Sequence, residues 1–282
     1  MLYPDAKSWH SAPHKSVLFF GMSGLGKTHI SKLLMQQGGW FHYSIDYRIG
    51  TSGMYRHIKD NLIKHAMSDP FLAQMLKADA MYIEPIVHDH DLSAVTAYLG
   101  KPGDPTRGGL QMAEYTRRQT QFREAEIAAL LDTPMFMERA QTLYDYPHFI
   151  CDTGGSICEW INPEDPDDPL LKKLSEHCLL VWIKGDAGHT RELVRRFDRA
   201  PKPMAYQPAF LERVWQEYLN KNNIEEGDVD PDTFIRWTYD QALEHRQPRY
   251  AAMAHHGITV TAEDIHAVTN AADFDALITS KL

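Results

Sequence analysis

The segment Gly21–Thr28, with the sequence GMSGLGKT, constrains the fold of this chain more than any other feature. Its spacing, G-x-x-x-x-G-K-T, is expected between a buried strand and the first turn of a helix. Both neighbours are present. Residues 16–20 form an apolar run that ends at a glycine, which is typical of a buried parallel strand. Residues 27–36 carry apolar side chains at helical spacing. The segment therefore predicts a strand–loop–helix unit of an α/β fold.

The chemistry of this segment is that of a phosphate-binding loop, or P-loop. Glycines let the backbone turn tightly and direct its N–H groups at phosphate oxygens, and the helix adds its positive N-terminal end. We expect Lys27 to reach the β- and γ-phosphates of a nucleotide and the Thr28 hydroxyl to bind Mg²⁺. The residues expected to contact the nucleotide are Gly21, Ser23, Gly24, Leu25, Gly26, Lys27 and Thr28. The alternative is a glycine-rich turn that binds nothing.

Four further apolar runs predict the rest of a sheet. They cover residues 41–45, 148–152, 178–183 and 257–261, and helical segments separate them. Strands that alternate with helices indicate a mostly parallel sheet covered on both faces.

Asp152 ends the third predicted strand and is followed by Thr153-Gly-Gly. A carboxylate at this place is expected to hold the hydration shell of Mg²⁺, so Asp152 joins Thr28 as a predicted metal site. Gly154 and Gly155 then leave room for a substrate to approach the backbone. The alternative is an aspartate that caps the next turn through its own backbone.

Composition limits the classes of partner. The 282 residues carry a formal net charge of -9, which disfavours nucleic acid and anionic membranes as partners. The 3 cysteines form no CxxC pair, which suits a reducing cytosol. Residues 1–16 lack the apolar run of a signal peptide, and no apolar stretch approaches the roughly 20 residues of a membrane helix. We expect a cytoplasmic protein.

Taken in order, several segments resemble shikimate kinase and its small-molecule kinase relatives. The P-loop is followed by residues 41–49, similar to a strand that ends in D-x-D-x-x-I, and by residues 121–126, similar to an F-R-x-x-E helix. Residues 153–156 resemble a T-G-G-G turn. Residues 193–204 resemble a helix and lid with an arginine and R-P-L, and residues 246–250 match R-x-P-x-Y before the last strand.

This resemblance implies a three-layer P-loop NTPase sandwich with a five-stranded parallel sheet in the order 2-3-1-4-5. The implied core covers residues 1–50 and 122–282, with a helical insertion at 51–121 and an enlarged lid at 200–245. The chain departs from the family pattern at Ser44, Ser156 and Lys202, and both extra segments fall where such kinases bind their acceptor or close their lid. Shikimate itself is therefore not the expected substrate.

The implied activity is ATP- and Mg²⁺-dependent transfer of the γ-phosphate to a hydroxyl of a small, acidic metabolite. The implied catalytic residues are Lys27, Asp46 and Asp152. The acceptor would contact Asp46, Arg123, Gly154, Gly155 and Arg246, and the nucleotide would also contact Arg195 and Lys202. Each has a plainer alternative: Asp46 as a helix N-cap, Arg123 and Arg246 in surface ion pairs, and Arg195 on a solvated helix face.

Two other functional classes stay open. One is a nucleotide-dependent switch or ATPase whose insertions bind a protein partner, and the other is a kinase-fold toxin or antibiotic phosphotransferase. The chain lacks an N-K-x-D guanine motif, which favours ATP over GTP. Residues 88–91, with the sequence His-Asp-His-Asp, are compatible with a divalent metal, but a solvated loop is the favoured interpretation.

Overall fold

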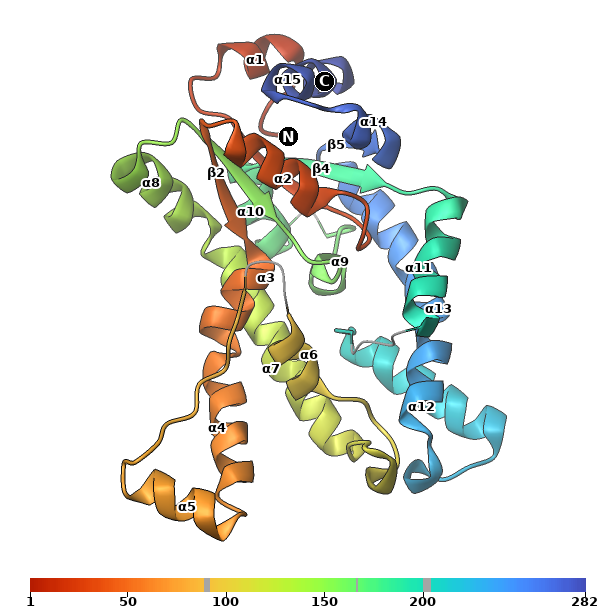
Figure 1. Ribbon diagram of the computed structural model, residues 1–282. Helices are drawn as coiled ribbons and strands as arrows, with labels where there is room; N and C mark the ends of the chain where they lie inside the picture. Colours follow the sequence, from red (N-terminus) through yellow and green to blue (C-terminus); the bar gives the residue numbers. More distant parts are fainter. Residues whose placement is uncertain (89–91, 166, 200–203) are drawn as a thin grey trace.

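A parallel sheet forms the centre of the computed structural model, which describes residues 1–88, 92–165, 167–199 and 204–282 (Figure 1). Its strands follow the order β2-β3-β1-β4-β5, and every neighbouring pair is parallel. This confirms the strand order 2-3-1-4-5 expected from the resemblance. The strands are β1 (Ser16–Phe20), β2 (Trp40–Ser44), β3 (His148–Asp152), β4 (Leu179–Lys184) and β5 (Ile258–Thr261).

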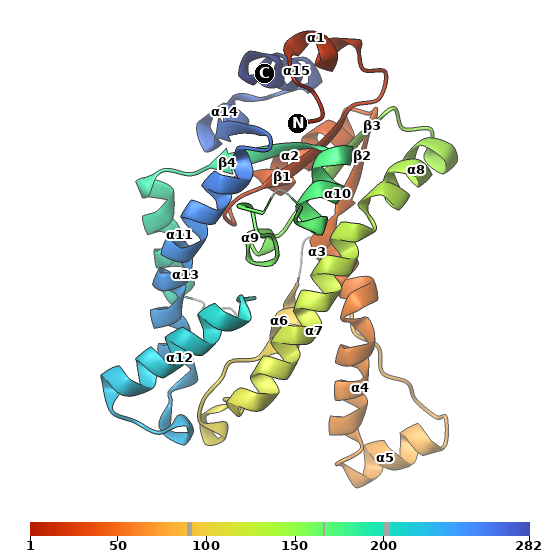
Figure 2. The same cartoon turned by 180° about the vertical axis from the view of Figure 1, so that it is seen from behind.

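The central strand β1 is apolar because other protein surrounds it on every side. All five of its residues are buried, and Val17 lies opposite Ile150 of β3 and Leu179 of β4. Helices cover both faces of the sheet. Figure 1 shows α2 in front of the strands and α10 behind them, and Figure 2 shows the reverse. The helices around the sheet are α1 (Ala6–Ser11), α2 (Lys27–Gln36), α8 (Thr133–Tyr144), α9 (Ile157–Trp160), α10 (Pro169–His177), α14 (Ala262–Ala267) and α15 (Ala271–Lys281).

Directly after β2 come α3 (Ile45–Arg48) and the π-helix η1 (Ile49–Gly53), and the segment expected as an insertion, residues 51–121, begins within η1 and leads away from the sheet. Its further elements are α4 (Tyr55–Ala66), α5 (Pro70–Lys77), α6 (Ser93–Leu99), the 3₁₀ turn η2 (Pro105–Arg107) and the start of α7 (Met112–Leu131). Helices α4 and α5 project from the body in both views (Figures 1 and 2). The boundary expected at residue 121 falls inside α7, so the insertion and the core share one helix.

The segment expected as a lid consists of helices on the other side of the molecule from α4 and α5 (Figure 1). It follows α11 (Ala187–Arg199) and contains α12 (Pro208–Asn222), η3 (Glu226–Asp228) and the first half of α13 (Pro231–Ala254). The expected end at residue 245 lies within α13. Asp230 caps α13 and Pro231 begins it, and the same Asp-Pro pair begins α5 and α10. Aspartate accepts from free N–H groups there, and proline lacks the N–H that would need a partner.

The two long helices are the natural candidates for crossing a membrane. In α7 and α13, charged residues recur along the helix, and no helix in the described part of the chain is long and apolar enough to cross a bilayer.

The three cysteines are buried and carry free thiols. Cys151 lies in β3, Cys158 in α9, and Cys178 immediately before β4. Burial raises the pKa of all three thiols, to about 12 for Cys158 and Cys178. The thiols are therefore held in their neutral form inside the core.

Candidate active site

The loop between β1 and α2 has the backbone that its glycines predict. Gly21, Gly24 and Gly26 have φ angles of 134°, 77° and 99°, the left-handed region that favours glycine. A Cβ at Gly21 would also lie 2.6 Å from the carbonyl oxygen of Ile183. Gly26 precedes α2, and no side chain caps that helix. The N–H groups of the first turn are therefore not bonded to a capping side chain.

Lys27 folds back across this loop. Its Nζ donates hydrogen bonds to the carbonyl oxygens of Gly21, at 2.9 Å, and Met22, at 2.8 Å. The side chain is buried, and this burial lowers its pKa, while the charges of Asp152 and Asp46 act in the opposite direction. The ammonium group is thus buried in the loop that an anion would enter, where the charges of two carboxylates act on it.

Asp152 and Thr28 lie where the sequence places them, at the end of β3 and in the first turn of α2. Asp152 is buried and lies opposite Phe19 of β1 and Ser44 of β2. Its Oδ2 is 3.4 Å from His42 Nε2, although the pair lacks the geometry of a hydrogen bond. Thr28 is exposed, so its hydroxyl is open to a ligand.

Asp46 is not a helix cap, because Ser44 has that role. The Ser44 Oγ accepts the N–H of Tyr47 at 3.2 Å, which leaves the Asp46 carboxylate available for other contacts. A Cβ built on Gly154 would lie 2.9 Å from Asp46 Oδ1, so the absence of a side chain at residue 154 allows the close approach. Burial and, to a smaller extent, the charge of Asp152 raise the pKa of Asp46 to about 6, although the charge of Lys27 opposes the shift.

Glu126 is a site residue to which the sequence-based reasoning gave no role. Its Oε2 accepts hydrogen bonds from Ser156 Oγ at 2.6 Å and Trp160 Nε1 at 2.7 Å. Its Oε1 is buried without a partner in the described chain and would lie 3.5 Å from a Cβ on Gly154. Burial raises the pKa of Glu126 to about 7, although Ser156 and Trp160 oppose this.

The carboxylates of Asp46 and Glu126 thus flank Gly154. Glu126 is the glutamate of the segment similar to F-R-x-x-E. The resemblance implies a function there only for the arginine, Arg123.

Arg246 lies beside the loop but already has an acidic partner. Its Nε donates to Glu159 Oε1 at 2.7 Å and its Nη2 donates to the carbonyl oxygen of Ala205. Burial raises the pKa of Glu159, but the charge of Arg246 and the hydrogen bonds from His245 and Arg246 together outweigh burial and lower the pKa to about 2. A Cβ on Gly155 would lie 3.8 Å from Arg246 Nη1 and 3.6 Å from the backbone N of Ser23. One edge of the guanidinium therefore faces the loop.

Arg123 lies one helical turn before Glu126 on α7. It is exposed and lines a pocket of about 290 Å³ between α7 and α12, together with Tyr206. Its guanidinium has neither a hydrogen bond nor an ion pair to any residue of the described ranges. Tyr206 follows Ala205, the residue that accepts from Arg246. The two arginines therefore border the same segment, but only Arg246 reaches the glycine turn.

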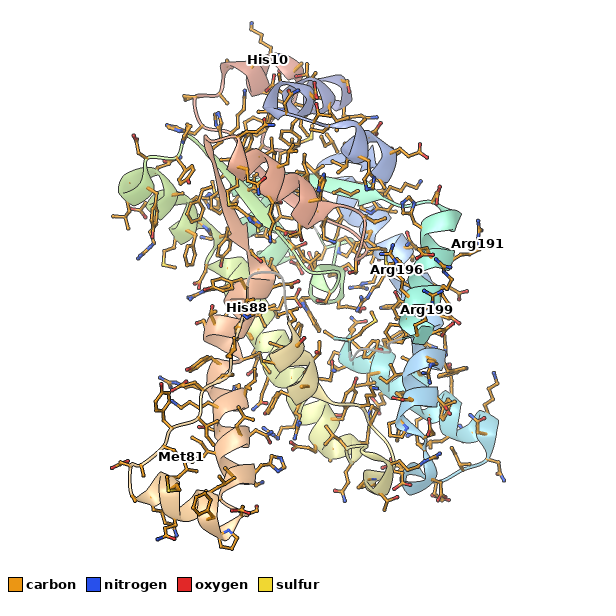
Figure 3. The ribbon with its side chains drawn as sticks, in the orientation of Figure 1. His10, Met81, His88, Arg191, Arg196 and Arg199 are labelled. Carbon is orange, nitrogen blue, oxygen red and sulfur yellow. The ribbon has the colours of Figure 1, made fainter. Side chains whose placement is uncertain are left out.

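The basic cluster of α11 is arranged differently from the expectation. Arg195 is exposed and bound to Glu192 at 2.6 Å, which fits the alternative of a solvated helix face. Arg196 is the arginine next to the loop, because its Nη1 would lie 3.8 Å from a Cβ on Gly24. Figure 3 shows Arg196 on the side of α11 that faces the loop and Arg191 on the outer side. Lys202 lies outside the described residues.

A metal site built from protein alone is not found in the described chain, where no three His, Cys, Asp or Glu side chains gather around one point. The His-Asp-His-Asp sequence at 88–91 lies mostly outside the described residues. A Mg²⁺ ion held by Thr28 and Asp152 would take its other ligands from phosphate and water, as Mg²⁺ commonly does.

Comparisons with known proteins give little further guidance. No protein-family model and no curated protein matches this chain. A solved structure that matches is a shikimate kinase from Bacteroides thetaiotaomicron, with 15% sequence identity and a TM-score of 0.36. The match covers 94% of this chain and 95% of that chain.

Proposed function

We propose that this protein is a kinase that transfers the γ-phosphoryl group of ATP, with Mg²⁺, to a hydroxyl of a small molecule. The observation that supports this best is the grouping of Lys27, Asp46 and Asp152 beside a glycine loop at the carboxyl ends of β1, β2 and β3. Ligands of open α/β sheets bind at this edge. Phosphoryl transfer requires a positive group at the phosphates, a carboxylate that holds Mg²⁺ and a carboxylate that accepts the hydroxyl proton. One buried ammonium and two carboxylates can supply these three groups.

The nucleotide side of the site needs backbone donors and positive charge. The N–H groups of the loop and of the first turn of α2 would hold the phosphates. Lys27 would exchange its two carbonyl partners for phosphate oxygens. Thr28 and Asp152 would hold Mg²⁺, which supplies neutralisation of charge when bound. Arg196, which also pairs with Glu192 but whose Nη1 would lie 3.8 Å from a Cβ on Gly24, would contact the phosphates, a role that the sequence suggests for Arg195.

The acceptor side needs a group that orients a hydroxyl. Asp46 would accept the hydroxyl proton while the acceptor oxygen forms a bond to the γ-phosphorus and the bond to the β-phosphate oxygen breaks, which releases ADP. Gly154 and Gly155 present no side chain, so the acceptor can approach the backbone between Asp46 and Arg246.

An acidic group on the acceptor stays in the proposal, but its expected partner changes. Two guanidiniums that share a pocket would favour an anion between them. However, Glu159 already offsets the charge of Arg246. Arg123, which has no partner in the described chain and lines a pocket, is the better candidate to bind an acidic group.

The decisive experiment is Lys27→Ala, with Lys173→Ala, an exposed lysine of α10, as the control. Each protein is mixed with ATP, Mg²⁺ and a panel of hydroxylated metabolites, and ADP release is measured. We expect the Lys27 variant to lose at least about 100-fold in kcat, as when a single transition-state donor is removed, with an unchanged thermal melt.

Full activity in a folded Lys27→Ala protein would disprove the proposal. ATP hydrolysis at the same rate with and without every acceptor would instead favour the nucleotide switch. Binding of GTP as tight as that of ATP would contradict the choice of nucleotide.

A further inference from the structure

The projecting segment of residues 55–88, here called the arm, consists of α4, α5 and the chain that returns toward the body (Figures 1 and 2). Between residues 60 and 88, Ala66 is the only buried residue. Large apolar side chains are nevertheless frequent there. Phe71 is 66% exposed, Tyr82 83% and Ile86 74%, and Leu62 and Met67 are exposed as well. In the described chain, the arm lacks a surface that covers these side chains.

Helix α5 shows this most clearly. Its apolar residues Phe71, Leu72, Met75 and Leu76 recur at helical spacing, a pattern that normally faces a protein core. None of its residues is buried. Soluble monomers rarely expose contiguous apolar patches of more than a few hundred Å², and larger ones mark sites of interaction. The sequence of α5 is therefore that of a helix whose packing partner lies outside the described chain.

The charges of the arm indicate what that partner is. The arm contains four basic residues and four acidic residues, so its formal charge is zero, whereas the whole chain carries -9. A neutral arm exerts no net attraction on an anionic membrane or a strongly charged protein. Two copies of this chain repel each other through their acidic bodies, and the repulsion is weakest where the neutral arms meet. The charged residues are Arg56, Lys59, Lys64 and Lys77, and Asp60, Asp69, Asp79 and Glu84.

We infer that the arm is the surface through which two copies of this chain associate. In a two-fold pair, α4 and α5 of each copy would pack against the same helices of the other, and residues such as Phe71 and Ile86 would be buried between them. Lys59 and Glu84 already pair within one arm at 2.5 Å. This inference does not depend on the proposed kinase activity.

The test is the mass of the full-length chain in solution, measured by sedimentation equilibrium over a range of concentrations. We expect a dimer of twice the 32.3 kDa chain. Phe71→Glu and Ile86→Glu should each raise the dissociation constant at least about tenfold, because each would bury a charge in the interface. Leu143→Glu, at a residue of α8 that is 62% exposed and lies outside the arm, should leave it unchanged.

Added salt and lipid vesicles distinguish association of two copies from binding to a membrane. Added salt should strengthen the dimer, because it screens the repulsion between the acidic bodies. A monomer at every concentration, or a dimer that resists both arm variants, would overturn the inference. Co-sedimentation with phosphatidylglycerol vesicles, lost in Phe71→Glu, would overturn it too and assign the patch to membranes. Circular dichroism melts confirm that the variants fold, as expected for exposed residues.

Discussion

At the scale of single residues, the ionised carboxylate of Asp46 lowers the stability of the folded protein, because burial disfavours its charge. In the unfolded chain its pKa is near 3.8, and in the folded protein it is about 6. The native state therefore binds more protons between these values, and stability falls as pH rises from about 4 to 6. Above pH 6 the penalty is complete. It is on the order of 1–3 kcal/mol, since one pKa unit corresponds to about 1.4 kcal/mol.

Asp46→Asn removes this penalty, because an amide does not ionise. In the absence of nucleotide and Mg²⁺, we expect the variant to be more stable than the wild type at pH 8 by roughly 1–3 kcal/mol. At pH 4 we expect almost no difference. Urea unfolding at the two pH values measures this. The same variant should bind ATP but lose phosphoryl transfer, because the group that accepts the hydroxyl proton is gone.

Glu176→Gln is the matched control, since Glu176 is exposed on α10 and lies outside both the candidate site and the arm, so it should alter neither stability nor transfer. An equal gain in stability at pH 4 and pH 8 for Asp46→Asn would show that ionisation is not the cause. Undiminished transfer would remove Asp46 from the acceptor site.

The sequence predicts the position of those candidate-site residues that directly follow a strand. Lys27, Asp46 and Asp152 follow β1, β2 and β3, and parallel strands bring such residues to one edge. Glu126 and Glu159 could not be placed in this way, because their positions depend on how α7 and α9 pack. The choice between Arg195 and Arg196 turns on a rotation of about 100° around a helix axis, which a short local pattern does not fix.

At the scale of elements, η1 joins the β2 side of the site to α7 by a close contact in which Gly53 has no side chain and packs against Ala125. A Cβ on Gly53 would lie 2.3 Å from Ala125 Cβ and 2.9 Å from its Cα. The next residue of α7 is Glu126. We expect Gly53→Ala to destabilise the protein by about 1–3 kcal/mol, as overpacking of a tight contact commonly does, and to displace Glu126 from Gly154.

Thermal unfolding and transfer activity measure these two effects. Gly227→Ala is the control, because a Cβ there would meet no atom within 4 Å. A Gly53→Ala protein as stable as the control would show that α7 and η1 can separate without loss.

The limits of the strands and of α2 could be predicted within about one residue. Apolar runs between glycines and charged residues mark such elements sharply. The predicted domain boundaries at residues 121 and 245 both fall inside long helices, α7 and α13. The apolar periodicity of a helix continues whether the helix contacts the core, the insertion or both, so it does not mark where one ends and the other begins.

At the scale of the whole molecule, the sequence indicated that an insertion exists but not that part of it stands free. The apolar pattern of α5 is the same as that of a helix in a core, and only the surrounding structure shows that nothing covers it. Our proposal of a dimer rests on this difference between the core-like sequence of α5 and its exposed position. It also implies that the two candidate sites of a pair would lie on separate bodies, joined through the helical run from α3 to α4.

The three buried thiols allow the unfolding of this protein to be measured by chemical labelling. Thiol reagents attack the thiolate, and burial keeps Cys151, Cys158 and Cys178 neutral and enclosed at neutral pH. We expect Ellman's reagent to modify none of them rapidly in the native protein and all three in urea. Labelling of the native protein should follow the rate of opening. ATP should slow it if it binds the loop beside β1, so protection can be measured without a known acceptor. Rapid modification of the native protein would contradict this burial.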